Sequence, residues 1–262
     1  MIKICVAGAT GRMGVAIIQE ARVKGIMTVG AVEAPNSPAI GKTLRELGIS
    51  DQDTRILSPK DLTQAAKDAD VYISFTAPAA EIQNIPTIAN MGKRIVLGTT
   101  GFTEEQDRQI RANLEKAPSI FSPNYSVGVN ILFKLAQFMK AFPEGYNISI
   151  SEIHHTGKKD APSGTALKLG EIVADARGYT TRVYGREGVS IRRPEELEIV
   201  AMRAGGVPGI HDLIVAGPHE MLRIEHTAFS RNVLAQGAVV AAEWLCKQNK
   251  PGIYSMATVL GL

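Results

Sequence analysis

The chain has 262 residues, with 29 Lys and Arg against 26 Asp and Glu, and a formal net charge of +3 at pH 7. This mild charge and an aromatic content of 5% exclude a protein that binds nucleic acid through a basic surface or stacked bases. Hydrophobic residues make up 45%, which is typical of a globular protein with a substantial core. The length fits one large domain or two small ones.

The start of the chain, MIKICVAGATG, lacks the basic segment, sustained apolar stretch and small-residue cleavage site of a signal peptide. No apolar run approaches the roughly 18 residues of a membrane span. Cys5 and Cys246 lie in apolar segments at opposite ends of the chain, so we expect free buried thiols rather than a disulfide. These features predict a cytoplasmic protein that has neither a membrane nor a nucleic acid as its partner.

The first 125 residues alternate between short β-branched segments and longer segments with helical periodicity. Thr103 and Gln106 have the spacing of a capping box at the start of one of these helices. Such alternation predicts an α/β fold with a Rossmann-type, doubly wound parallel sheet that carries helices on both faces. Residues 33–58 are expected to be irregular. The expected strands are 2–7, 27–32, 71–75, 94–97 and 119–121, and the expected helices are 12–24, 79–90 and 104–116.

After residue 125 the pattern changes, because strands follow one another without intervening helices. This order predicts a second α+β domain built on a mixed sheet. We expect residues 1–125 plus 231–262 to form the dinucleotide-binding domain, and 126–230 to form a domain for substrate binding and oligomerisation. Residues 178–196 show little periodicity. The expected helices are 127–140, 163–177 and 231–247, and the expected strands are about 147–153, 197–204, 209–216 and 220–228.

A glycine-rich segment, Gly8–Gly14, joins the first strand to the first helix. Glycines at 8, 11 and 14 suit a tight turn, a close approach of the backbone to a pyrophosphate, and close packing of helix on strand. The helix start then presents backbone N–H groups and a positive dipole end to the phosphates. In this setting the segment predicts dinucleotide binding, with Arg12 as an additional phosphate contact. A glycine-rich turn without a ligand is the alternative.

Glu33 ends the second strand, where an acid can accept hydrogen bonds from the ribose hydroxyls of an adenosine. Its carboxylate would repel the 2′-phosphate of NADP, and the following Ala34 supplies no cation. We therefore predict a preference for NADH over NADPH. The alternative is a solvated charge at the end of a strand.

Small and hydroxyl-bearing residues follow two further strands, at Phe75-Thr76 and at Gly98-Thr99-Thr100. Ligands of open parallel sheets bind at the carboxyl ends of the strands, so these residues are candidates for contacts to ribose and nicotinamide. The same residue types are also common in loops that bind nothing.

The segment Glu152–Ala166 carries most of the polar chemistry of the second domain. His154 and His155 can exchange protons near neutral pH, and Lys158 and Lys159 add positive charge. Ser163-Gly164-Thr165 opens a helix, whose N–H groups could receive a carboxylate or phosphate. The alternative is a histidine pair beside a solvated basic loop, with Ser163 as a simple helix cap. We predict no metal site, because no cluster of cysteines or carboxylates has ligand spacing.

The pattern E-x-H-H-x-x-K-x-D-x-P-S-G-T-A, from Glu152 to Ala166, resembles the signature of the dihydrodipicolinate reductase (4-hydroxy-tetrahydrodipicolinate reductase) family. Segments along the whole chain are similar to that family as well. They are Gly8–Gly14, Phe75-Thr76, Gly98–Phe102, Asn124–Asn130 and Tyr184–Gly188.

The resemblance implies an NAD(P)H-dependent oxidoreductase of lysine and diaminopimelate biosynthesis that reduces 4-hydroxy-tetrahydrodipicolinate, a cyclic dicarboxylate. It implies a homotetramer, and it assigns catalysis to His154 and Lys158. Ala34 departs from the arginine of many members. The expected substrate contacts are His155, Lys158, Ser163, Gly164 and Thr165. The expected cofactor contacts are Gly8, Thr10, Gly11, Arg12, Met13, Gly14, Glu33, Phe75, Thr76, Gly98, Thr99, Thr100, Ser122, Asn124 and Tyr125.

Two rival functions share the glycine segment. Another NAD-dependent dehydrogenase of small molecules could use the same two-domain plan, but it would not need the series of cationic and N–H groups from Lys158 to Thr165. A dinucleotide sensor without catalysis would be expected to lose the histidine and lysine groups, which are intact here.

Overall fold

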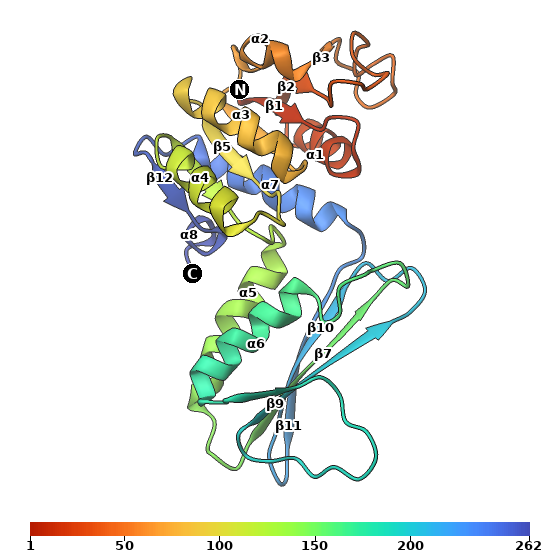
Figure 1. Cartoon of the computed structure of the whole chain (residues 1–262), viewed down its shortest axis with the longest axis vertical. Helices are drawn as coiled ribbons and strands as arrows, with labels where there is room; N and C mark the ends of the chain where they lie inside the picture. Colours follow the sequence, from red (N-terminus) through yellow and green to blue (C-terminus); the bar gives the residue numbers. More distant parts are fainter. The chain divides into compact units, whose positions relative to one another are not determined.

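The computed structural model describes residues 1–262, which divide into two compact units. The first unit contains residues 1–126 and 232–261, and the second contains residues 127–231 (Figure 1). The boundaries expected from the sequence lie one residue away at each junction.

The first unit is built on a seven-stranded sheet in which every paired strand is parallel. The strand order is β12-β6-β5-β4-β1-β2-β3, so the chain moves outward in one direction from β1 and then in the other from β4. This reversal confirms the Rossmann-type fold class. The strands are β1 (Lys3–Ala7), β2 (Met27–Val32), β3 (Ile56–Leu57), β4 (Val71–Ser74), β5 (Arg94–Leu97), β6 (Pro118–Phe121) and β12 (Gly252–Tyr254).

Successive strand residues face opposite sides of this sheet and enter two separate cores. Ile4 and Val6 pack with α1, α7 and α8, whereas Cys5 and Ala7 pack with α2, α3 and α4. The predicted capping box of Thr103 at the start of α4 is confirmed. The helices are α1 (Arg12–Val23), α2 (Leu62–Ala66, after a 3₁₀ turn at Pro59–Asp61), α3 (Pro78–Asn90), α4 (Glu104–Leu114), α7 (Asn232–Leu245) and α8 (Met256–Leu260).

Short elements account for most differences from the sequence prediction. The region 33–58 contains β3, and the tail adds β12 and α8. These strands have two and three residues, too few to show periodicity, and each exists because a longer neighbour pairs with it at the edge of the sheet. The final helix α7 packs on α1 within the same unit.

The second unit has a five-stranded mixed sheet of order β11-β10-β7-β9-β8, with α5 and α6 packed together on one face (Figure 1). The predicted α+β architecture is confirmed. The predicted helix 127–140 ends at Ala136 and continues as a 3₁₀ turn, and the region 178–196 contains the short edge strand β8. The elements are α5 (Val127–Ala136), the 3₁₀ turn Gln137–Ala141, β7 (Asn147–His154), α6 (Gly164–Arg177), β8 (Thr181–Val183), β9 (Glu196–Arg203), β10 (Ile210–Ala216) and β11 (Met221–Thr227).

Strand β7 changes character along one face. Its buried residues alternate, with Ile148 and Ile150 in the apolar core beneath the helices. The same period of two then places Glu152 and His154 on that face, beyond the apolar part. The strand therefore places two buried polar side chains beside the apolar core.

Cys5 and Cys246 are free thiols, as predicted, but only Cys5 is buried and Cys246 is half-buried. Burial raises the pKa of the Cys5 thiol to about 12. None of the helices has the length and apolar character needed to cross a bilayer.

Candidate active site

The glycine-rich segment Gly8–Gly14 connects β1 to α1 at the carboxyl edge of the parallel sheet. Gly8 has a φ of +65°, and a Cβ on Gly14 would lie 2.0 Å from the carbonyl oxygen of Gly8. Gly11 is the N-cap of α1, and no side chain caps this helix. The first backbone N–H groups of α1 are thus available for another acceptor, and the segment fits a pyrophosphate.

Glu33 lies directly after β2 and is anchored beside this turn. Its Oε2 accepts hydrogen bonds from the backbone N–H of Thr10 at 2.9 Å and from the Thr10 hydroxyl at 2.6 Å. Its Oε1 accepts from the backbone N–H of Ala34 at 2.9 Å. These contacts hold the half-buried carboxylate at the place where an acid can receive ribose hydroxyls.

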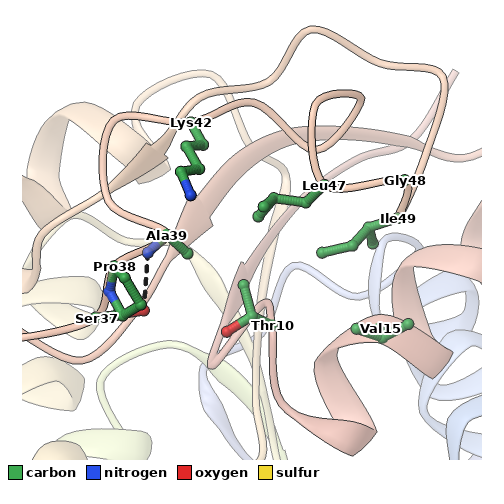
Figure 2. Close-up of a pocket in the computed structure, with 9 residues that line it drawn as sticks. All are labelled: Thr10, Val15, Ser37, Pro38, Ala39, Lys42, Leu47, Gly48 and Ile49. Atoms are coloured by element: carbon green, nitrogen blue, oxygen red, sulfur yellow. Dashed lines mark hydrogen bonds between the residues drawn. The ribbon is translucent and has the colours of Figure 1, made fainter.

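A pocket of about 570 Å³ adjoins Thr10, and Lys42 is one of its lining residues. Figure 2 shows the Lys42 amine directed toward the same space as the Thr10 side chain. The residues next to Glu33 in the sequence do not predict this cation, because an irregular loop brings Lys42 back to the pocket. The lining residues are Thr10, Val15, Ser37, Pro38, Ala39, Lys42, Leu47, Gly48 and Ile49.

The carboxyl ends of β4 and β5 meet, as expected of neighbouring parallel strands. The backbone N–H of Thr76 donates to the Thr99 hydroxyl at 2.9 Å, and both hydroxyls bond to the carboxylate of Glu81. Gly98 gives room to the ring of Phe75, while Thr100 and Arg12 are exposed. Glu81 was not among the predicted residues, since nothing in its helical segment marks it.

The turn after β6 is held by hydrogen bonds among its own residues, and it contains Ser122, Asn124 and Tyr125. The Ser122 hydroxyl donates to the carbonyl of Asn124 at 2.8 Å. Tyr125 is 1% exposed, and its hydroxyl contacts the carbonyl oxygens of Leu97 and Ile120. The side chain of Tyr125 therefore lies in the core, packed on Phe75 with ring centroids 5.2 Å apart.

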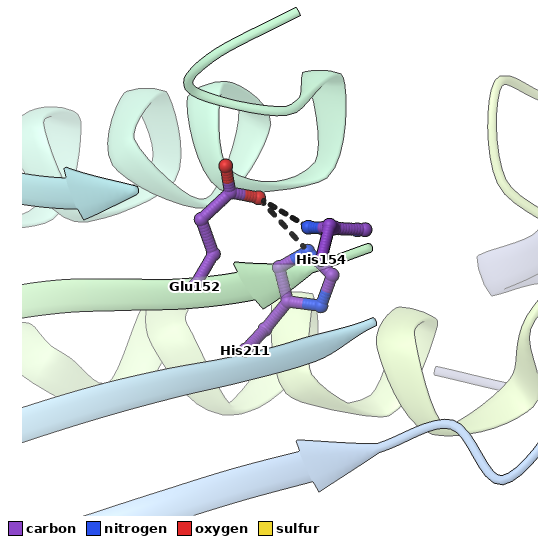
Figure 3. A group of neighbouring side chains, drawn as sticks. All are labelled: Glu152, His154 and His211. Atoms are coloured by element: carbon purple, nitrogen blue, oxygen red, sulfur yellow. Dashed lines mark ion pairs between the residues drawn. The ribbon is translucent and has the colours of Figure 1, made fainter. Parts of the chain in front are cut away.

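In the second unit, strand register assembles a polar cluster around Glu152. His211 on β10 lies directly opposite Glu152 on β7, and Arg203 on β9 lies opposite His154. Glu152 Oε2 is 3.0 Å from His154 Nδ1 and 3.8 Å from His211 Nε2 (Figure 3). Arg203 reaches Glu152 Oε1 at 3.2 Å. His211 and Arg203 were not predicted, because only the register of three strands brings them to Glu152.

Glu152 is charged although it is fully buried. Burial alone raises the pKa of a carboxyl group, but the close contact with His154 and the hydrogen bond from Ser163 outweigh it and bring the pKa of Glu152 to about 2. The N–H at His154 Nδ1 is not aligned for a full hydrogen bond, so this contact is mainly electrostatic. A small rotation of the ring would complete it and leave Nε2 for a substrate.

A glycine directly before β10, Gly209, adjoins His154 Nε2. A Cβ on Gly209 would lie 3.1 Å from His154 Nε2. The absence of a side chain at this position keeps space beside that nitrogen.

The ligand atoms of Glu152, His154 and His211 all lie within 4.8 Å of one another, a spacing that a metal ion could bridge. Ligand spacing along the chain predicts no such cluster, because His211 is distant from the other two residues in the sequence. Arg203 already supplies a positive charge to Glu152, which disfavours a second cation in the same buried place. The cluster is therefore better suited to orienting a proton on histidine.

The loop after β7 brings Lys158 to the start of α6. Lys158 Nζ is 2.9 Å from Asp160 Oδ1. The Lys158 amine, together with the backbone N–H of Gly164, holds the pKa of Asp160 below its usual range. A carboxylate of the chain thus lies between the lysine and the helix start, which are two of the groups predicted to receive the carboxylate of a ligand.

Two further predicted residues of this region have protein partners. Ser163 caps α6 by accepting from the backbone N–H of Ala166 at 3.2 Å, and its own N–H donates to Glu152 at 2.9 Å. Its hydroxyl also lies 3.3 Å from His211 Nε2. The Nε2 of His155 lies 3.1 Å from a guanidinium nitrogen of Arg231.

His211 gives a prediction for stability against pH. Burial, with His154 adding to it, lowers the pKa of His211 from 6.5 to about 4. Below pH 6.5 the unfolded chain binds a proton that the folded protein does not, so stability falls as pH falls from 6.5 toward 4. His211→Asn should abolish about 2 to 3 kcal/mol of this loss between pH 6.5 and 4.5, since each pKa unit corresponds to about 1.4 kcal/mol.

Urea unfolding of the wild type and His211→Asn at several pH values measures this difference. The window ends at pH 4.5 because Glu152, with its lowered pKa, begins to destabilise the fold only below that value. If the free energy of unfolding changed with pH in the same way in the two proteins, the result would contradict a neutral, buried His211.

A dinucleotide cradle on a Rossmann-type sheet, with a buried His–Glu cluster in a separate α+β unit, defines a two-domain, pyridine-nucleotide-dependent oxidoreductase. The family model for the N-terminus of dihydrodipicolinate reductase matches residues 2–125, and the model for its C-terminus matches residues 128–260. The chain belongs to the dihydrodipicolinate reductase family.

Curated relatives agree with this family over the full length. The chain is 43% identical over 267 residues to the 4-hydroxy-tetrahydrodipicolinate reductase of Methanosarcina acetivorans, and 44% identical over 270 residues to that of Methanosarcina mazei. Each match covers 100% of both chains. The dipicolinate-bound dihydrodipicolinate reductase from Paenisporosarcina sp. TG-14 has the same fold, with a TM-score of 0.75, 22% identity and 97% coverage of each chain.

Proposed function

We propose that the chain reduces 4-hydroxy-tetrahydrodipicolinate to tetrahydrodipicolinate, with loss of the 4-hydroxyl group as water, in the biosynthesis of diaminopimelate and lysine. The observation that carries this proposal is the carboxylate of Asp160 between the Lys158 amine and the start of α6, next to the buried His154. A cyclic dicarboxylate needs cations and N–H donors for its carboxylates, and a proton donor for its reduction. The activity of the curated relatives supports the same assignment.

The cofactor supplies the hydride when it is bound. The chain holds it through the first N–H groups of α1, with Gly8, Thr10, Gly11, Arg12, Met13 and Gly14 around the pyrophosphate. Glu33 accepts the adenosine ribose hydroxyls. The residues after β4, β5 and β6 face the nicotinamide half, where Tyr125 acts through its packing on Phe75. The remaining contacts on that side are Thr76, Gly98, Thr99, Thr100, Ser122 and Asn124.

His154 donates the proton that balances the hydride. Glu152 holds Nδ1 through its negative charge, so the ring presents Nε2 to the substrate, beside Gly209. The same charge stabilises a positive His154 before the proton leaves. The buried, already assembled cluster keeps this geometry without reorganisation.

Lys158 and the start of α6 receive a carboxylate of the substrate, which takes the place of Asp160. The N–H groups of Gly164 and Thr165 and the ring of His155 complete the binding of the two carboxylates. The hydroxyl of Ser163 stays on the helix cap and on His211, so Ser163 acts by fixing the start of the helix.

A homotetramer formed through the sheet of the second unit is part of this proposal. Both α-helices of the unit pack on one face of the sheet. Met202 on β9 and Met221 on β11 lie on the other face and are 43% and 65% exposed. Exposed apolar side chains on an extended sheet support an interface between subunits.

The nucleotide preference is proposed to be NADH, with Lys42 allowing some use of NADPH. A coupled assay with aspartate semialdehyde, pyruvate and the preceding synthase, followed by loss of nicotinamide absorbance, gives kcat/KM for both cofactors. We expect a higher value with NADH. Glu33→Gln should reduce the NADH-to-NADPH ratio about tenfold, the size expected for losing a charged hydrogen bond to ribose.

Lys42→Ala is the matched variant, because it should lower kcat/KM with NADPH and leave NADH turnover unchanged. A wild-type ratio that strongly favours NADPH would overturn the preference but not the reaction. Absence of turnover with either nucleotide would overturn the reaction itself and favour another dehydrogenase or a sensor.

A further inference from the structure

The carboxylate of Glu81 is buried in the first unit without an opposite charge beside it. It lies in the first turn of α3 and is fully buried, and no cationic side chain pairs with it. One oxygen, Oε1, accepts three hydroxyls, from Ser74 and Thr76 at 2.5 Å each and from Thr99 at 2.7 Å. The other oxygen, Oε2, has no hydrogen-bond partner. An arrangement this unfavourable for a charge calls for an explanation beyond packing.

The helix start and the hydroxyls together keep this charge in place. The positive end of the α3 dipole lies at its first turn, where Glu81 is found. Hydrogen bonds to an ionised acceptor are also stronger than neutral ones. Replacing the carboxylate by an apolar residue would leave three buried or half-buried hydroxyls to find new partners.

The carboxylate determines which way the three hydroxyls point. An ionised carboxylate only accepts hydrogen bonds, and each hydroxyl has a single proton to give. Ser74, Thr76 and Thr99 therefore all direct that proton at Glu81 and keep only acceptor capacity. Thr99 uses it for the backbone N–H of Thr76 at 2.9 Å. The half-buried Thr76 hydroxyl is left as an acceptor for a donor from outside the network.

The position of the network identifies that donor. Strands β4 and β5 lie on the opposite side of β1 from β2, whose end carries Glu33. In a doubly wound sheet the two halves of a dinucleotide lie on opposite sides of the reversal in strand order. The network therefore belongs to the nicotinamide half, whose ribose hydroxyls and carboxamide NH₂ are hydrogen-bond donors.

We propose that Glu81 is a positioning residue for the nicotinamide half of the cofactor: it fixes Thr76 and Thr99 as acceptors, and Thr76 receives a donor of the nicotinamide riboside. This inference rests on the proposed binding of a pyridine nucleotide. It assigns no chemistry to Glu81 itself, which does not touch the cofactor.

The test compares the affinity of NADH with that of ADP, which lacks the whole nicotinamide riboside, by calorimetry on the full chain. Glu81→Gln keeps the shape of the side chain but places two N–H donors near hydroxyl protons. We expect its dissociation constant for NADH to rise about tenfold, as for a lost hydrogen bond to a charged network, while that for ADP stays unchanged. Unchanged ADP binding also reports an intact fold.

Two further comparisons complete the experiment. Thr76→Val should weaken NADH binding as Glu81→Gln does, and Thr76→Ser, which keeps the hydroxyl, should restore it. Glu33→Gln, on the adenosine side, should weaken both ligands. Should Glu81→Gln fail to fold, the Thr76 pair decides the question.

The outcomes separate the possible roles. Equal loss of NADH and ADP binding in Glu81→Gln would indicate a structural role and overturn the inference. Unchanged binding of both ligands would overturn it as well, as would equal NADH affinities of Thr76→Val and Thr76→Ser. A wild-type protein that binds ADP and NADH with the same affinity would show that the nicotinamide half has no site here. A wild type that binds neither ligand would overturn the proposed function itself.

Discussion

His154→Ala is expected to lower kcat at least about a hundredfold, the usual scale for the loss of an acid–base group. His154 is buried on a rigid strand, with Glu152 3.0 Å from Nδ1 and Gly209 beside Nε2. The neighbouring His211 cannot take over, because its pKa is lowered to about 4 and it stays neutral. Steady-state kinetics in the coupled assay measure the effect.

The matched control for this variant is His219→Ala. His219 is exposed in the connection between β10 and β11, so its removal should leave kcat unchanged. The affinity for NADH should also be unchanged in His154→Ala, because the nucleotide cradle belongs to the other unit. Turnover of His154→Ala close to wild type would refute its role as the proton donor.

Lys158→Ala is expected to lower kcat at least about a hundredfold as well, and to raise KM for the substrate. Lys158 is the cation beside the start of α6, where its amine holds a carboxylate 2.9 Å away. Its removal takes away both the positive charge that binds a carboxylate of the substrate and the group that orients the reacting ring. Kinetics at varied substrate concentration separate these two effects.

Lys159→Ala is the control for Lys158→Ala, since it removes the same charge one residue further along. Lys159 is exposed, whereas the side chain of Lys158 is 20% exposed. We expect Lys159→Ala to behave as the wild type. If both variants lost activity to the same modest extent, the loop would act through its total charge and not through a specific contact of Lys158.

Features carried by adjacent residues could be predicted from the sequence. The glycines of Gly8–Gly14 act through backbone geometry inside one strand–turn–helix unit, and the structure gives them that geometry. The alternation along β7 places Glu152 and His154 on one face by its period alone. The capping box of Thr103 and Gln106 is local in the same sense.

Features that depend on the pairing of distant segments could not be predicted. His211 and Arg203 reach Glu152 only because β10 and β9 pair with β7 in one particular register. A shift of one residue would turn both side chains to the other face. Lys42 reaches the pocket beside Thr10 through an irregular loop, and the strands β3, β8 and β12 are too short to be recognised without their neighbours.

The sequence by itself determined the class of fold and the place of the glycine turn, and it named the candidate histidines and lysines, because these follow from short-range geometry and side-chain chemistry. Only the tertiary structure decided which groups act on them. In the second unit, Glu152 contacts His154, the neutral His211 lies opposite Glu152 on the neighbouring strand, and Asp160 pairs with Lys158. In the first unit, Glu81 accepts hydrogen bonds from Thr76 and Thr99. The charge state of a buried group and the direction of a hydroxyl depend on neighbours within a few ångströms, and long-range chain pairing sets those neighbours.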